Sequence, residues 1–432
     1  MADIDGQLLT AAGVDLARMI ANREVSAAEV VGAHLERIEA VNGELGAIVQ
    51  LNTSALDEAR AADRAIARGE VVGPLAGVPF TVKDWIEVAG LVCAAGYAER
   101  ASYVPAQDAV VVQRMRAAGA IVLGKSNVTD GAPLYPRPVN PRDPARTPGS
   151  SSSGEAAIIA AGGSPLGLAS DSGGSIRWPA HCCGVAALKP STGLVPNTGH
   201  FPRIGHLSDP RTTIGPMARS VRDLEAVLRV IAGADAGDPG SVPVHLASAQ
   251  GVDMGELRVA WFVEFPGTTP TAATAAAVEA AARALEERGA EVVEAVPPRL
   301  EESLPITEAY WARVQSTSFR DWRPPWASKL SADDIERSRF EWERFSRSMA
   351  VFMSDFDVVL SPVAARPAPE HGRWDRREYL YTLPWSLTGQ PAAAVPFGVS
   401  GEGLPIGVQI VARRWHDEVA IAVAVALEAA RG

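Results

Sequence analysis

The stretch Thr147–Pro190 reads TPGSSSSGEAAIIAAGGSPLGLASDSGGSIRWPAHCCGVAALKP. It contains two clusters of small residues, Gly149–Gly154 and Ser170–Arg177, on either side of the apolar segment Ala156–Ala161. A flexible Gly/Ser linker has no reason to contain such an apolar segment. Glycines beside a serine allow φ > 0 and a close approach of the backbone to a ligand, and successive N–H groups in such a turn can bind an anion. We therefore expect two serine loops, joined by a buried helix, that meet at one site.

The two clusters resemble the sequence signature of the amidase signature family, a family of serine amidohydrolases. The matching segments are PGSSSSG at Pro148–Gly154 and SDSGGSIR at Ser170–Arg177. By position, Ser175 matches the family's nucleophile, and Ser151 matches the serine that precedes a cis peptide bond and relays a proton. Ser151 lies 24 residues before Ser175, which is the family's spacing. The resemblance implies a Ser–cis-Ser–Lys triad.

The third member of that triad would be Lys83, in the segment GVPFTVKD at Gly77–Asp84. Its neighbours are apolar, among them Phe80, Trp85 and Ile86. Such surroundings disfavour the charged form of a lysine, so that it can act as a neutral base near pH 7. From the residues alone, a solvated lysine at the end of a strand is an equal alternative. The similarity to the family's lysine segment favours the catalytic role.

The resemblance covers nearly the whole chain and is weakest at 233–350. It implies an α/β fold, with a single large mixed β-sheet covered on both faces by α-helices. It also implies one amidase domain spanning residues 1–432, in which 60–230 and 355–420 form the signature core. Residues 233–350 would be the variable part that shapes the substrate pocket.

A serine hydroxyl attacks an amide only when a nearby base takes its proton. No G-x-S-x-G turn surrounds either cluster, and none of the seven histidines has a recognisable triad setting, so a Ser-His-Asp mechanism has little support. In the relay that the resemblance implies, Lys83 accepts a proton through Ser151 while Ser175 attacks, and an acyl-enzyme forms. The oxyanion needs donors where its charge develops. The candidates are the backbone N–H groups of Ser172, Gly173, Gly174 and Ser175.

Three further residues are expected to support this machinery. Ser152 is placed to hydrogen-bond within the relay. For Asp171 and Arg177 we favour a structural role over a catalytic one, as an ion pair or a set of hydrogen bonds that holds the second loop in shape.

The first cluster departs from the family pattern. Ser150 and Ser153 stand where the family usually has glycine, so the loop reads SSSS. If the geometry needs glycine at either position, activity is lowered or the acyl pocket narrowed. Four adjacent serines also leave the register open, because Ser152 could take the relay role assigned to Ser151.

Hydrophobic periodicity predicts the main helices and strands. Helices are expected at 8–47, with Ser26 as an N-cap inside this range, and at 54–68, 109–118, 221–232 and 272–288. Strands are expected at 74–82, 121–123, 184–189, 257–262 and 290–296.

One motif is rejected. Gly119–Ser126, GAIVLGKS, matches the phosphate-loop pattern GxxxxGK[ST]. A phosphate loop follows a strand, whereas here Ile121–Leu123 is itself an apolar strand preceded by a helix. The family has a similar segment in this place, which makes Asn127 a structural or pocket-lining residue at most.

Composition excludes several classes of protein. The 432 residues carry a formal net charge of −11, so binding of nucleic acid through a basic surface is not expected. Three cysteines, two of them adjacent, form no disulfide framework and no CxxC zinc site, which favours a reducing, cytoplasmic location. The start of the chain has no signal-peptide pattern. No apolar run is long enough to span a membrane.

Aromatic residues are concentrated at 301–350, above the 6% of the whole chain. Most are expected to pack helices onto the core. A minority lining the pocket would suit an amide with an aromatic or extended apolar group. The residues are Tyr310, Trp311, Trp322, Trp326, Trp342 and Phe345.

Three functions remain open on the sequence. The first is a stand-alone amidase, with esterase side activity, that acts on a small-molecule amide, needs no cofactor or metal, and forms a homodimer by default. The second is one component of an amidotransferase that works with partner chains on glutamine. The short, aromatic region 301–350 speaks against it. The third is a non-catalytic binding protein with the same fold, which the SSSS loop keeps open.

Overall fold

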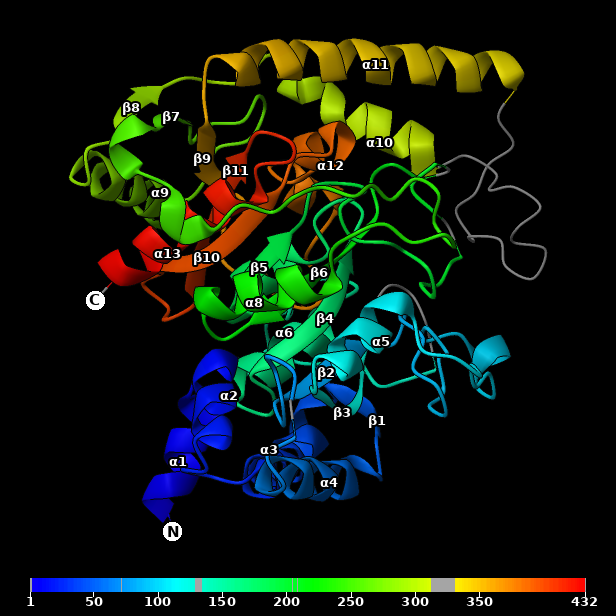
Figure 1. The fold of residues 1–432 in the computed structure, drawn as a ribbon. Coiled ribbons are helices and arrows are strands. Elements are labelled where there is room, and N and C mark those ends of the chain that lie inside the picture. Colours follow the sequence, from blue (N-terminus) through cyan, green and yellow to red (C-terminus); the bar gives the residue numbers. More distant parts are fainter. Residues whose placement is uncertain are drawn as a thin grey trace.

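The structure is a computed structural model that describes residues 2–70, 72–128, 134–203, 205–207, 209–311 and 331–431. Eleven strands of the described residues form one sheet in the order β1-β3-β2-β4-β6-β5-β10-β11-β9-β7-β8 (Figure 1). The strands are β1 (Ile48–Leu51), β2 (Pro79–Lys83), β3 (Ile121–Ser126), β4 (Leu166–Asp171), β5 (Ala186–Lys189), β6 (Thr213–Ala218), β7 (Arg258–Trp261), β8 (Glu291–Glu294), β9 (Val358–Pro362), β10 (Ala392–Val399) and β11 (Pro405–Ala412). The helices are α1 (Ala2–Thr10), α2 (Gly13–Ala21), α3 (Ala27–Leu45), α4 (Ala55–Ala67), α5 (Val110–Ala117), α6 (Ser153–Ala160), α7 (Arg177–Cys183), α8 (Val221–Ile231), α9 (Ala272–Glu286), α10 (Ser303–Trp311), α11 (Ala332–Ser354), α12 (Leu383–Thr388) and α13 (Asp417–Ala430).

The sheet is mixed. Strand β2 is parallel to its neighbours β3 and β4, while β4 is antiparallel to β6. The long strands β10 and β11 pair antiparallel, and β7 is parallel to β8 and β9. Strands β2, β3, β4, β6 and β11 are buried along their whole length, as expected of central strands covered on both faces.

Helices cover both faces of the sheet, as the resemblance implied. Gly398 and Gly407 lie on opposite faces of the β10–β11 pair; a Cβ at Gly398 would meet Ala277 of α9, and a Cβ at Gly407 would meet His181 of α7. Helix α13 contacts both α8 and α9 in the layer of α9, and α6 contacts α7 in the other layer. Figure 1 shows α11 along one end of the molecule and α1 to α4 at the opposite end.

The prediction of one helix over 8–47 is wrong, because this segment is divided among the three helices α1, α2 and α3. Helix α2 begins anew at Gly13, where the Asp223 carboxylate accepts hydrogen bonds from the N–H groups of Gly13 and Val14. The predicted N-cap is confirmed: Ser26 and Glu29 form a capping box that starts α3. A buried carboxylate distant in sequence therefore decides a boundary that periodicity misses.

The other predicted elements are found with shifted ends. Strand β2 begins at Pro79 rather than at residue 74 and extends to Lys83. Strand β3 covers Ile121–Ser126, so most of the GxxxxGK[ST] match is strand, and the rejection of a phosphate loop is confirmed. Asn127 is structural, since its amide donates hydrogen bonds to the carbonyl oxygens of Gly46 and Pro136.

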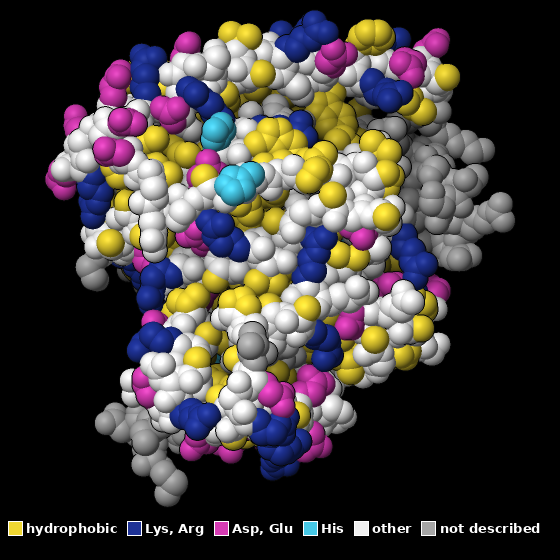
Figure 2. Space-filling view, viewed as in Figure 1, with side chains coloured by type: hydrophobic (Ala, Val, Ile, Leu, Met, Phe, Trp, Pro, Cys, Tyr) yellow, Lys and Arg dark blue, Asp and Glu magenta, His cyan; other side chains and the backbone are white. Residues whose placement is uncertain are grey.

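The described surface carries charges of both signs. On the face shown in Figure 2, acidic and basic side chains are interspersed with apolar ones. None of the helices in the described ranges combines the length and apolar character that crossing a bilayer requires.

Candidate active site

The topology brings Lys83 and the second serine cluster to the same edge of the sheet. Strands β2 and β4 are parallel neighbours, with Val82 aligned to Leu168. Lys83 is the last residue of β2, and Asp171 is the last residue of β4. Because parallel strands end at the same edge, the loop that follows Asp171 is placed beside Lys83. We call Asp171–Ser175 the nucleophile loop.

The first serine loop, Ser150–Ser153, reaches the same place from the start of α6. The Lys83 Nζ and Ser151 Oγ atoms are hydrogen-bonded at 2.6 Å, and both side chains are buried. Ser152 Oγ donates instead to the carbonyl oxygen of Ser170, at 3.3 Å. The contact with Lys83 thus favours Ser151 over Ser152 as the relay serine.

The cis peptide bond implied by the resemblance is not found. Phe201–Pro202 is the cis bond of the described residues, so the bond between Ser151 and Ser152 is trans. A cis bond before a residue other than proline costs about 3–4 kcal/mol and needs a local gain to offset it. Here the peptide bonds of the first serine loop are trans, and Gly149, at φ +109°, turns the backbone before it. The Ser151 hydroxyl reaches Lys83 in this conformation, so no cis bond is needed for the contact.

The side chain of Ser175 is bonded to a residue that sequence reasoning treated only as a departure from the family. Ser150 Oγ and Ser175 Oγ are hydrogen-bonded at 3.1 Å. Ser175 is half-buried, whereas Ser150 and Ser151 are almost completely buried. Of these three hydroxyls, Ser175 is therefore the one open to a substrate.

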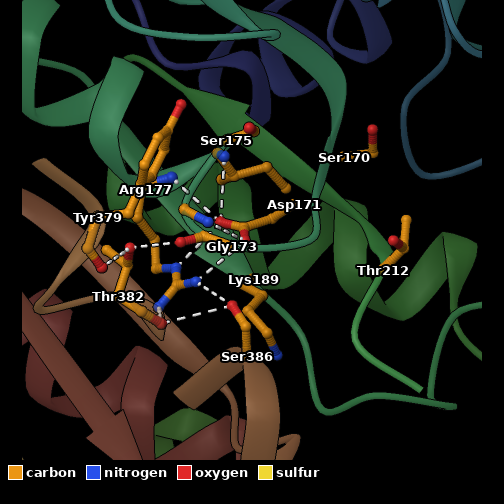
Figure 3. Close-up of polar contacts among 12 residues, drawn as sticks. Ser170, Asp171, Gly173, Ser175, Arg177, Lys189, Thr212, Tyr379, Thr382 and Ser386 are labelled. Carbon is orange, nitrogen blue, oxygen red and sulfur yellow. Dashed lines mark hydrogen bonds and ion pairs between the residues drawn. The ribbon is translucent and has the colours of Figure 1, made fainter. Parts of the chain in front are cut away.

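Asp171 and Arg177 hold the nucleophile loop. Figure 3 shows the Arg177 guanidinium between the Asp171 carboxylate and α12, where it donates to the Thr382 carbonyl and the Ser386 hydroxyl. Burial raises the pKa of Asp171, but the charge and hydrogen bonds of Arg177 outweigh it and lower the pKa to about 2. These contacts are the ones expected of a pair that holds the nucleophile loop in shape.

The same carboxylate orders the backbone of the loop. Asp171 accepts hydrogen bonds from the N–H groups of Gly174 and Ile176. Gly174 has φ +141°, and a Cβ there would lie 2.4 Å from Thr382 Oγ1, so only glycine fits. Among the described residues, the N–H groups of Ser172, Gly173 and Ser175 donate to no acceptor. Of the four expected oxyanion donors, Gly174 is thus already engaged.

Glu155 is a buried acid that sequence reasoning missed. It lies in α6, directly after the first serine loop, and accepts hydrogen bonds from the hydroxyls of Thr81 and Ser126. Burial raises its pKa to about 7, although both hydrogen bonds act in the opposite direction. Glu155 therefore fastens α6 to β2 and β3 beneath the site. Its place after the SSSSG run was the only available signal.

Ser170, a further partner of Lys83, and His200, a partner of Ser170, were also missed. Ser170 Oγ lies 3.1 Å from Lys83 Nζ, and His200 Nε2 lies 2.8 Å from Ser170 Oγ. Ser170 stood within the quoted stretch, next to Asp171. His200 follows a proline-rich and glycine-rich segment and carries no local signal that separates it from the other histidines.

Aromatic rings border the nucleophile loop. A Cβ at Gly173 would lie 3.4 Å from Trp311 Cζ2, and a Cβ at Gly174 would lie 2.9 Å from Tyr379 Cδ1. Phe345 is fully buried in the core, as expected for most of the cluster. The rings of Tyr310 and Trp342 pack edge to face at 5.7 Å. Trp322 and Trp326 lie outside the described residues.

The family model described as Amidase matches residues 29–321 and 316–420. This chain belongs to the amidase family. The resemblance noted in the sequence is therefore confirmed over nearly all of its length.

Curated relatives match over most of their length. The indoleacetamide hydrolase of Bradyrhizobium diazoefficiens is 32% identical over 96% of this chain and 85% of its own. The acylamidase of Rhodococcus erythropolis is 32% identical over 96% of this chain and 94% of its own. A glutamyl-tRNA(Gln) amidotransferase subunit from Salinispora arenicola is 32% identical over 98% of both chains. The two hydrolases are thus as similar to this chain as the amidotransferase component is.

A solved structure of 6-aminohexanoate cyclic dimer hydrolase complexed with substrate superposes with a TM-score of 0.85, at 27% identity, over 98% of this chain and 97% of that chain. With the family match, this confirms the fold class and makes the chain an enzyme of the group that hydrolyses amide C–N bonds.

Proposed function

We propose that this amidase-family chain hydrolyses the C–N bond of a small carboxylic amide with an aryl or apolar acyl group, through Lys83, Ser151 and Ser175. The observation that carries the proposal is the buried 2.6 Å contact between Lys83 and Ser151, in the same serine loop whose Ser150 bonds to the half-exposed Ser175. A base, a relay and an accessible hydroxyl are the parts that an activated serine needs.

The proposed reaction begins with Lys83 as a neutral amine. As Ser175 Oγ attacks the amide carbonyl carbon, its proton passes to Ser151, and the Ser151 proton passes to Lys83. To do so, the Ser175 hydroxyl exchanges its bond to Ser150 for one to Ser151. The same path, run in reverse, protonates the leaving amine as the C–N bond breaks. Water then attacks the acyl-enzyme with the relay acting again as a base, and Ser175 is released.

The negative charge of the tetrahedral intermediate develops next to the nucleophile loop. Its donors are assigned to the N–H groups of Ser172, Gly173 and Ser175. The Gly174 N–H, which belonged to the expected set, holds the loop through Asp171 instead. Donors fixed by the fold before reaction stabilise an oxyanion without reorganisation.

The substrate class is inferred from the wall of the site. Trp311 and Tyr379 approach the two glycines of the nucleophile loop, so the acyl group meets aromatic surface. Trp311 belongs to residues 233–350, which supports the assignment of this part of the single 1–432 domain to substrate selection. Esters should react as a side activity, because an alkoxide leaves more readily than an amine.

The test is treatment of the folded protein with a fluorophosphonate probe, followed by mass-spectrometric peptide mapping. We expect one adduct, on Ser175, that disappears in Ser175→Ala. The matched control is Ser172→Ala, which removes another half-buried serine three residues away and should keep the adduct. An adduct at any other serine, or none on folded protein, contradicts the proposed nucleophile.

The amidotransferase alternative predicts a different preference. If the chain works on glutamine together with partner chains, it should co-purify with them and hydrolyse glutamine faster than an aryl amide. The aromatic wall favours the opposite order. A folded protein that binds aryl amides without turnover would support the non-catalytic alternative.

A further inference from the structure

We propose that His200 is a positioning residue which, through the hydroxyl of Ser170, directs the lone pair of Lys83 toward Ser151. The inference deepens the proposed function and rests on it. His200 lies in the loop after β5, where its backbone forms an isolated bridge with Ile86. Its ring is buried and packs edge to face on Trp85 at 5.9 Å.

The contacts form a continuous chain from the histidine to the relay. His200 Nε2 lies 2.8 Å from Ser170 Oγ, and Ser170 Oγ lies 3.1 Å from Lys83 Nζ. The carbonyl oxygen of Ser170 lies 3.3 Å from the same Nζ atom. Lys83 Nζ in turn lies 2.6 Å from Ser151 Oγ. Ser170 therefore touches the base with two oxygen atoms.

The ring of His200 is neutral, with its proton on Nδ1. Burial is the main cause that lowers the pKa of His200, so one ring nitrogen carries hydrogen and the other accepts. Nδ1 faces the carbonyl oxygen of Pro202 at 3.5 Å, and a carbonyl can only accept. The hydrogen is therefore assigned to Nδ1. Nε2 is left as the acceptor of the Ser170 hydroxyl proton.

The count of hydrogens then shows which contacts of Lys83 can only accept from it. Ser170 has one hydroxyl proton, and once it is donated to His200, Ser170 Oγ can only accept from Lys83. The Ser170 carbonyl also accepts from Lys83. A neutral amine has two N–H groups and one lone pair, so directing both N–H groups to Ser170 turns the lone pair toward the Ser151 proton.

The opposite tautomer would disable the base. With hydrogen on Nε2, His200 would donate to Ser170, and the Ser170 hydroxyl proton would point to the Lys83 lone pair. That lone pair is the one that the relay needs. A buried histidine without contact to the relay serine would thus control whether the lysine can accept a proton.

The first experiment reads the tautomer directly. In ¹⁵N NMR of the ring nitrogens, the signals of His200 are those missing from the His200→Gln variant. We expect a protonated Nδ1 and an unprotonated, hydrogen-bonded Nε2. A neutral ring with hydrogen on Nε2 would overturn the inference, even in an enzyme whose Ser175 reacts as proposed.

The second experiment is a double-mutant cycle of His200→Phe and Ser170→Ala. A misdirected base should lower kcat by about 10- to 100-fold, less than the roughly 10²- to 10⁴-fold that general-base catalysis supplies in full, and leave KM within about twofold. The double variant should be no slower than Ser170→Ala alone, because both changes break the same chain of contacts. If the kcat losses of the two single variants multiply in the double variant, or if only KM is affected, the positioning role is refuted.

Two further variants separate positioning from packing. His200→Gln keeps an amide oxygen near the Nε2 position and should recover most of the kcat lost in His200→Phe. His34→Gln changes another buried histidine, in α3, that bonds to the Val30 carbonyl, and should leave kcat unchanged. Labelling of wild-type Ser175 by the fluorophosphonate probe tests the proposed function separately. If it occurs while His200→Phe keeps full kcat, the inference about His200 fails alone.

Discussion

In the nucleophile loop one carboxylate holds the backbone, whereas in the first serine loop the side chains each bond to a different partner. Asp171 accepts hydrogen bonds from the backbone N–H groups of Gly174, Ile176 and Arg177 and is paired with the Arg177 guanidinium. In the first serine loop, Ser150 bonds to Ser175, Ser151 to Lys83, and Ser152 to a carbonyl oxygen. The first arrangement holds the backbone of the nucleophile loop in one conformation. The second places serine hydroxyls for the proposed proton transfer.

The difference gives the two loops different sensitivities. A change at Asp171 should act first on stability, because it leaves the buried charge of Arg177 without its partner. A change in the first serine loop should act first on rate, because a hydroxyl can be removed from it without leaving a buried charge.

The largest effect is expected within the first serine loop. Ser151→Ala should lower kcat by about 10²- to 10⁴-fold, because the proton of Ser175 loses its path to Lys83. Ser152→Ala, the adjacent control, should lower kcat by less than about tenfold, since Ser152 bonds to a backbone carbonyl. Steady-state hydrolysis of an aryl amide measures both. The reverse order of the two losses would assign the relay to Ser152.

The next effect is on the stability of the nucleophile loop. Asp171→Asn leaves the Arg177 guanidinium buried without its counter-charge, and the free energy of unfolding should fall by about 3–5 kcal/mol. Asp15→Asn breaks an ion pair with Arg222 that is largely exposed, and should cost less than about 1 kcal/mol. Urea denaturation compares the two. Equal losses would mean that the buried pair does not hold the loop.

These contrasts also mark what the sequence could predict. The spacing of the serine clusters and the GVPFTVKD match predicted Lys83, Ser151 and Ser175 as residues of one site, and apolar runs located five of the eleven strands of the described residues. The contact between Ser150 and Ser175 could not be predicted, because the directions of four adjacent hydroxyls depend on one turn of backbone. His200 was missed because only the loop after β5 brings it to Ser170.

The third prediction concerns the pH dependence of stability that arises from Glu155, in α6. The folded-state pKa of Glu155, raised by burial to about 7, lies above its ordinary value of 4.5, so the folded protein binds the proton more tightly than the unfolded chain. The stability that protonated Glu155 contributes to the folded state is fully present below pH 4.5 and is lost as the pH rises through 7. Relative to Glu155→Gln, wild-type stability should fall by about 3 kcal/mol across this window. Parallel pH profiles from urea denaturation would contradict a buried, protonated Glu155.

The smallest effect is expected at the position where this chain departs from its family. Ser150 holds the Ser175 hydroxyl at 3.1 Å, and the proposed relay requires that bond to be exchanged for one to Ser151. Ser150→Gly restores the family residue and removes the competing hydroxyl, so kcat should rise by a few-fold, about 1 kcal/mol or less for one neutral hydrogen bond. Ser153→Gly, the other serine in place of a family glycine, is the matched control and should leave kcat unchanged.

The direction of the Ser150→Gly result separates two roles for this side chain. A gain in kcat for aryl amides would show that Ser150 restrains the nucleophile, and that the first serine loop sets the reaction rate through one removable contact. A loss comparable to that of Ser151→Ala would instead place Ser150 in the proton path, between Ser175 and the pair of Ser151 and Lys83. Only a gain in kcat agrees with a first serine loop whose serines act separately.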